Sequence, residues 1–187
     1  VSIAFGGKTL SLPAIVKDSA VTPELSFKLD IMPIFMKANC NTGSCHGAAS
    51  GKDGFRLSLF GFDHVGDYQR VTREIGNRRI NLAFPHDSLM LTKSTGSVPH
   101  TGGTRFRKGD PLYSLMHEWI DAGAVADKTD IPICTKIEVY PKSAVLDGEG
   151  ATQQITVRAF YSDGTNRDVS HLAFFLSSNE NSYNEAI

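Results

Sequence analysis

The sequence has no excess of charge of either sign, no long apolar run and few cysteines. Nineteen Lys and Arg against twenty Asp and Glu give a formal net charge of -1, so no overall field attracts the chain to nucleic acid. No apolar stretch approaches the roughly 18 residues that a membrane span needs. We therefore expect no nucleic-acid partner and no membrane span. Low-complexity segments and repeats of solenoid period are also missing.

What is present is typical of globular protein. The chain has 187 residues, of which 41% are hydrophobic and 21% charged, enough for one large domain or two small ones. The pattern changes twice along the chain, and we predict three parts with limits at 1–20, 21–133 and 134–187.

The first part predicts a β-hairpin. Val1–Phe5 and Thr9–Val16 alternate apolar and polar residues around Gly6-Gly7. A lone hairpin is marginally stable in water, so we expect this one to belong to a larger sheet and to associate through its strands with another module or another copy.

The middle part predicts helices joined by loops that contain glycine. A helix over Asp30–Ala38 ends just before Cys40, and Asp67 is the expected N-cap of a second helix. A short third helix is expected over Ser88–Lys93. The strongest pattern begins with Asp110 as cap and Pro111 at the first position; its apolar stripe contains Leu112, Leu115, Met116, Trp119 and Ile120.

The last part predicts strands. Ile137–Tyr140, Gln153–Tyr161 and Leu172–Ser177 have strand composition, and Asp163-Gly164 predicts a tight turn. Three strands are fewer than the seven or so of a β-sandwich, so we expect an incomplete all-β module.

The segment 40–46, CNTGSCH, is the candidate site. Covalent haem needs two thiols for the porphyrin vinyl groups and an imidazole directly after the second, and Cys45-His46 meets the second requirement. Four residues separate Cys40 from Cys45 where two are usual. We expect Gly43 to take the positive φ that would let this longer loop bulge outward.

Three other interpretations of the segment remain open. Cys40 and Cys45 could form a disulfide, or join His46 and a further ligand such as Cys134 in a zinc site, or be unrelated thiols.

The residues from Phe27 to Ala124 resemble the planctomycete-type cytochrome c domains of large extracytoplasmic proteins. The matching pieces are Cys45-His46-Gly47, Gly54-Phe55-Arg56-Leu57-Ser58-Leu59-Phe60-Gly61, Asp67-Tyr68, Ser88-Leu89-Met90-Leu91, His100 with Gly102-Gly103, and Trp119-Ile120 with Gly123. This resemblance implies covalently attached haem c with its iron, electron transfer, and a periplasmic or cell-surface location.

The tail resembles a bacterial Ig-like domain of the second group. The matching residues are Ile137, Val139, Pro141, Gly148, Tyr161-Ser162-Asp163-Gly164 and Asp168-Val169-Ser170. Together the resemblances imply a mainly α cytochrome c-like domain (21–133) followed by a partial all-β Ig-like sandwich module (134–187), with residues 1–20 as the terminal hairpin of a preceding Ig-like module. The chain would then be an internal segment of a multi-domain α and β protein.

His46 would supply one axial ligand to the iron, and the second ligand decides between electron transfer and ligand chemistry. Related domains often place a Met before a Pro here, but this chain has Val98-Pro99. We expect His100, in its glycine-bearing loop, to be the sixth ligand, with Met90 as the alternative and Met116 as a packing residue.

Several other residues have weaker assignments. Arg70, Arg73, Arg78 and Arg79 form a basic cluster that we expect to be a solvated helix face; haem propionates or an acidic partner are the alternative. Arg105 and Arg107 are further candidates for propionate contacts. Cys134 is expected to be buried, and no role is assigned to His64, His86, His117 or His171.

The sequence thus predicts an electron relay whose partner is a redox protein or an adjacent domain of the parent protein. It offers no catalytic constellation of its own. Two alternatives stay open: a structural or carbohydrate-binding Ig-like module with a Cys40–Cys45 disulfide, and a haem enzyme or sensor with an open distal site.

Overall fold

Two apolar segments from opposite ends of the middle part form the core of the structure, a computed structural model that describes residues 1–16 and 19–178. The first is a π-helical turn, Phe27–Ile31, continuing into α1, Met32–Lys37. The second is α4, Pro111–Asp121, which begins at Asp110 and Pro111 as the sequence predicts. The rings of Phe27 and Trp119 lie 5.3 Å apart, and both side chains are almost fully buried.

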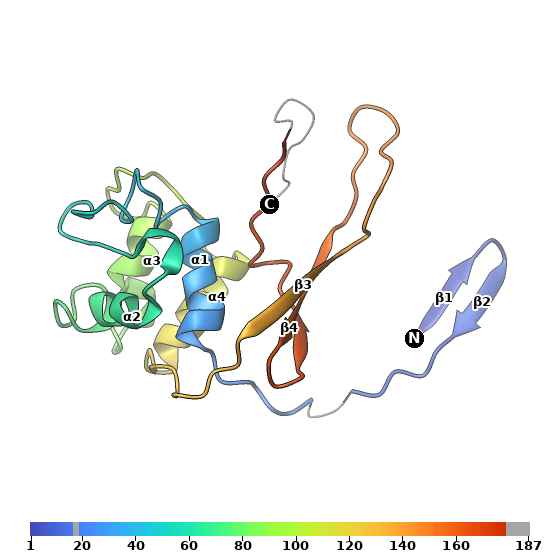
Figure 1. Ribbon diagram of the computed structural model, residues 1–187, viewed down its shortest axis with the longest axis horizontal. Coiled ribbons are helices and arrows are strands. Elements are labelled where there is room, and N and C mark those ends of the chain that lie inside the picture. Colours follow the sequence, from blue (N-terminus) through green and yellow to red (C-terminus); the bar gives the residue numbers. More distant parts are fainter. Residues whose placement is uncertain (17–18, 179–187) are drawn as a thin grey trace.

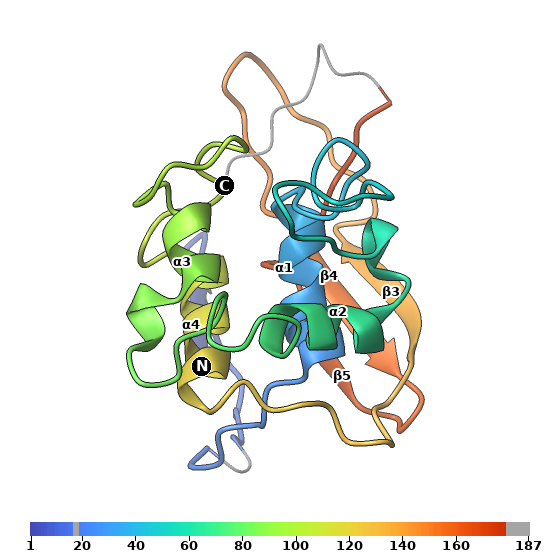
Figure 2. The same cartoon turned by 90° about the vertical axis from the view of Figure 1, so that its left-hand side faces the viewer.

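The remaining helices are short and surround this core (Figure 2). They are α2, His64–Thr72, and α3, Leu89–Ser94, with 3-10 turns at Leu59–Gly61 and Pro85–Asp87. Val71 of α2 and Leu91 of α3 are buried in the same cluster. Among the residues that the structure describes, no helix is long and apolar enough to cross a membrane.

The amino-terminal hairpin is confirmed and stands apart from the rest of the chain (Figure 1). Strands β1, Ser2–Phe5, and β2, Lys8–Ser11, pair antiparallel. Gly6 and Gly7 form the turn with φ of 57° and 74°, values that glycine adopts without strain. The second strand ends at Ser11 rather than at Val16.

A three-stranded antiparallel sheet follows the helices. It contains β3, Cys134–Tyr140, β4, Thr156–Tyr161, and β5, Asn166–Asp168, in that order. The predicted turn at Asp163-Gly164 joins β4 to β5, with Gly164 at φ 81°. The predicted strand over Leu172–Ser177 is wrong, because the Leu172 amide closes a turn onto the Val169 carbonyl and the Leu172 side chain is buried in the core.

One arginine ties the sheet to the helices. Arg167 of β5 forms an ion pair with the buried carboxylate of Asp30 at 2.6 Å and donates to the Leu29 carbonyl at 2.9 Å. Beside this link, a pocket of about 550 Å³ lies between α1 and the sheet, and its walls are mainly apolar. The sheet is therefore tied to the π-helical turn through Arg167, and this pocket lies between its inner face and α1.

The expected fold class, a mainly α domain joined to an all-β sandwich, is wrong. The described residues form four α-helices of 6 to 11 residues and two small sheets. Between helices, residues such as Asn39, Asp53 and Phe60 take left-handed conformations that interrupt regular structure. The inner face of the three-stranded sheet meets α1 where a sandwich would place a second sheet.

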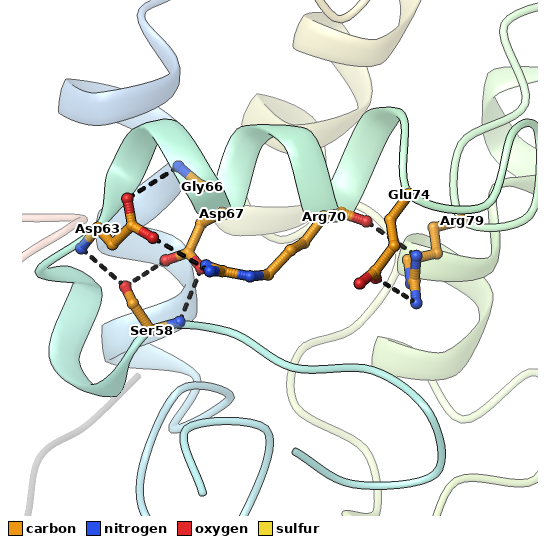
Figure 3. Close-up of polar contacts among 7 residues, drawn as sticks. All are labelled: Ser58, Asp63, Gly66, Asp67, Arg70, Glu74 and Arg79. Atoms are coloured by element: carbon orange, nitrogen blue, oxygen red, sulfur yellow. Dashed lines mark hydrogen bonds and ion pairs between the residues drawn. The ribbon is translucent and has the colours of Figure 1, made fainter. Parts of the chain in front are cut away.

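The start of α2 also differs from the prediction. Its N-cap is Asp63, whose carboxylate accepts from the Gly66 amide at 3.0 Å. Asp67 lies inside the helix, fully buried, and accepts from the Ser58 amide at 2.7 Å and from Arg70 at 2.8 Å (Figure 3). Buried carboxylates require such partners, so Asp67 fixes the segment before α2 onto the helix.

We predict that Asp67→Ala lowers the free energy of unfolding by about 3–5 kcal/mol, because it leaves Arg70 and the Ser58 amide without their buried acceptor. Urea denaturation at neutral pH measures the change. The control is Asp121→Ala, which removes an exposed carboxylate from α4. Equal midpoints for the two variants would contradict this role of Asp67.

Candidate functional site

The site begins where α1 ends. Asn39 takes a left-handed conformation, φ 56°, directly after the helix, and the Cys40 amide donates to the Phe35 carbonyl at 2.8 Å. Cys40 packs against the apolar cluster. Burial raises the pKa of its thiol to about 12, so the thiol is protonated at neutral pH.

The long Cys40–Cys45 spacing is accommodated in a closed loop. The His46 amide donates to the Cys40 carbonyl at 3.0 Å, and the Cys45 and Gly47 amides both donate to the Thr42 carbonyl at 3.0 Å. Gly43 does not adopt the expected positive φ. The left-handed residue is instead Asn39, before the first cysteine. The longer spacing is accommodated by the hydrogen bonds to the Cys40 and Thr42 carbonyls.

Gly47 follows the histidine in a place with no room for a side chain. A Cβ built there would lie 2.1 Å from the Asn41 carbonyl oxygen, whereas a Cβ at Gly43 would meet nothing within 4 Å. The loop can close over Asn41 only because residue 47 is glycine.

Phe55 contacts the imidazole of His46 through both its carbonyl and its ring. Its Nδ1 lies 3.0 Å from the Phe55 carbonyl oxygen, and the two rings are 4.8 Å apart. A carbonyl can only accept, so Nδ1 carries the proton and Nε2 the lone pair. Burial lowers the pKa of His46, which favours the neutral form that a metal ligand requires.

The imidazole of His100 is likewise anchored to a backbone carbonyl. Its Nδ1 lies 2.8 Å from the Gly103 carbonyl oxygen, which again assigns the lone pair to Nε2. Gly102 makes room for the ring, since a Cβ there would lie 2.9 Å from Cε1 of His100. The absence of a side chain at Gly102 therefore lets the backbone lie against the imidazole of His100.

His46 and His100, 54 positions apart in sequence, form a parallel imidazole pair. Their ring centroids are 6.4 Å apart and their planes differ by 4°. A metal–imidazole bond is about 2.0 Å long and a ring nitrogen lies roughly 1.1 Å from its centroid, so two imidazoles on opposite sides of one metal ion have centroids about 6.2 Å apart. The structure therefore brings the two predicted ligands to a centroid spacing close to this value.

Cys45 lies next to this pair. Arg105 extends its guanidinium toward Cys45, with Nη2 3.9 Å from Sγ. The same Nη2 would lie 3.0 Å from a Cβ at Gly102, and Nε2 of His100 would lie 3.1 Å from that point. Arg105 is thus the proposed propionate contact that adjoins the site, while Arg107 is exposed.

The other interpretations of the cysteines need a disulfide or further metal ligands. All three thiols are free. Cys134 is exposed on β3, so its predicted burial is wrong; its thiol contacts the Lys136 carbonyl at 3.6 Å. Within residues 1–16 and 19–178, no group of three or more His, Cys, Asp or Glu side chains is placed to hold a metal ion. Zinc would need such a group, whereas an iron porphyrin needs only two protein ligands.

The methionines serve the core. Met116 of α4 is 2% exposed, and Met90 of α3 packs against the same apolar cluster. Both are where helical periodicity places packing residues, and Met90 stays the alternative sixth ligand.

The four arginines of the basic cluster differ in their surroundings. Arg73 and Arg78 are exposed, as a solvated face predicts. Arg70 is tied to Asp63 and Asp67, and Arg79 is buried. Sequence reasoning missed both internal roles, because a run of basic residues does not reveal which members face the protein.

Comparison with known proteins gives no relative. Neither a family model, nor a curated protein, nor a solved structure matches this chain. The functional assignment therefore rests on the geometry of the site and on the sequence motifs.

We predict that Gly47→Ala lowers the free energy of unfolding by about 1–3 kcal/mol, the usual cost of forcing a methyl group into a closed space. Gly43→Ala, in the same loop with open space around it, should leave stability within about 0.5 kcal/mol of the parent. Thermal and urea unfolding measure both. A loop that tolerates both substitutions equally would contradict the packing described here.

Proposed function

We propose that this chain carries one covalently attached haem c and acts as an electron relay within a larger extracytoplasmic protein. Cys40 and Cys45 would form the thioethers, and His46 and His100 would be the axial ligands. The observation that carries the proposal is the parallel imidazole pair, 6.4 Å apart, with both Nδ1 atoms held by carbonyl oxygens.

The residues present fit the group. Two free thiols lie in the same loop as His46, and both histidines keep Nε2 as the basic nitrogen. Hydrogen bonds from Nδ1 to carbonyl oxygens are the usual outer contacts of metal-binding histidines. The motifs that resemble planctomycete-type cytochrome c domains support the same assignment.

The bound haem would supply one-electron redox chemistry, and the chain's own residues would set its properties. Two histidines give a lower potential than a His/Met pair. They would also occupy both axial positions, which would favour electron transfer over binding of small molecules. The buried rings of Phe27 and Trp119 belong to the core against which Cys40 packs. They would help exclude water from the bound haem.

The partner of this relay would be a redox protein or a neighbouring domain of the parent protein. The extracytoplasmic location rests on the family resemblance alone. The alternative, a structural module with a Cys40–Cys45 disulfide, predicts colourless protein without iron.

We predict that protein produced together with a haem c attachment system is coloured and keeps its haem through acid-acetone extraction. Cys40→Ser combined with Cys45→Ser should abolish this covalent haem, because no thiol remains in the loop. Cys134→Ser is the matched control and should retain all of it, since that thiol lies on β3. Haem that stays attached to the double variant, or colourless parent protein, would contradict the proposal.

The sixth ligand is tested separately. His100→Ala should convert the low-spin spectrum of the oxidised protein to a high-spin one that responds to cyanide, because an axial position opens. Met90→Leu keeps the volume of the core side chain and should leave the spectrum unchanged. The reverse pattern would make Met90 the ligand, and a parent protein that is already high-spin would favour a haem enzyme or sensor.

A further inference from the structure

Arg79 is a buried cation that contacts the segment Gly54-Phe55, whose Phe55 carbonyl accepts from His46. Its side chain is 5% exposed and its guanidinium donates to two backbone carbonyls, those of Arg70 at 2.8 Å and Gly54 at 3.0 Å. It also pairs with the carboxylate of Glu74 at 3.1 Å (Figure 3). A charge this deeply buried is stable only while all these partners remain, so its position is fixed.

The guanidinium also covers an aromatic ring. Its central carbon lies 4.5 Å from the ring centroid of Phe55, within the range of a cation–π contact. Arg79 therefore holds the segment Gly54-Phe55 at two points, the Gly54 carbonyl and the Phe55 ring.

That segment is the one that orients His46. The Phe55 carbonyl accepts from Nδ1 of His46 at 3.0 Å and from the Lys52 amide at 2.9 Å. The rings of Phe55 and His46 are in contact as well, 4.8 Å apart. A shift of Gly54-Phe55 would therefore move the acceptor that fixes the tautomer of His46.

We propose that Arg79 is a positioning residue for His46, acting through Gly54 and Phe55. The guanidinium is suited to this because its planar fork can donate to two carbonyls and a carboxylate while one face lies on the ring. A lysine keeps the charge but cannot make these contacts together. The functional meaning rests on the proposed haem site, where the Nδ1–carbonyl bond sets the basicity of the ligand.

The first test uses the full chain without haem. In the parent protein, nitrogen NMR of the His46 ring should show the single tautomer with the proton on Nδ1. Arg79→Lys should give a mixture of tautomers, because the carbonyl of Phe55 is no longer held in place. The control is Arg73→Gln, which changes an exposed arginine at the end of α2. It should match the parent.

The second test uses the haem-loaded chain. Arg79→Lys preserves the charge, so a change in midpoint potential reports the lost positioning. We expect a shift to higher potential, because a weaker Nδ1 hydrogen bond makes His46 a poorer donor to oxidised iron. Arg73→Gln should shift far less. An unchanged tautomer and potential in Arg79→Lys would overturn the proposal.

Phe55→Leu keeps the test decisive if Arg79→Lys does not fold. It retains the backbone carbonyl and removes the ring beneath the guanidinium, so smaller changes in the same direction are expected; no change would again overturn the proposal. If the parent chain takes up no haem, the proposed function fails, while the tautomer measurement still decides the role of Arg79.

Discussion

The proposed site depends on the fixed spacing of two imidazoles. His46 and His100 come from separate loops, and each is anchored through Nδ1 to a backbone carbonyl, so their parallel arrangement at 6.4 Å does not rely on a contact between the rings. Each ring is therefore positioned by its own loop. Around them, the closed loop from Cys40 to Gly47 rests on the apolar core through Cys40, while the Cys45 thiol faces Arg105.

Loops held by specific hydrogen bonds take the place of long helices in positioning these groups. Asp67 fixes the segment before α2, and Arg79 fixes the segment that carries the acceptor for His46. Arg167 connects the three-stranded sheet to the helical part through Asp30. Such buried ion pairs add little net stability, but loss of one partner is costly. They define the geometry of irregular segments where helical periodicity cannot.

Sequence patterns predicted the elements whose cause is local. Gly6-Gly7 specifies its turn, and Pro111 takes the first position of α4 as predicted, while the Asp110 side chain in the N-cap position makes no capping hydrogen bond. The prediction of His100 as the partner of His46 stays a prediction, although the two rings are neighbours. The fold class was wrong because strand and helix propensities do not tell how far an element extends or what covers it.

The remaining errors share a physical origin. Asp67 is a residue type that often caps helices, but the N-cap is Asp63, whose carboxylate accepts from the Gly66 amide. Asp67 is instead buried against Ser58 and Arg70. Cys134 follows an apolar stretch yet is exposed on β3. In both cases the outcome depends on which side chain reaches which partner in the folded chain, and the residue pattern alone does not specify this.

The most direct measurement for the central claim is X-ray absorption at the iron edge of the purified, oxidised protein. If His46 and His100 are the axial ligands, the first shell contains six nitrogen donors, four from the porphyrin and two from imidazoles. A sulfur donor in that shell, a shell of five ligands, or protein that contains zinc or no metal would contradict the account.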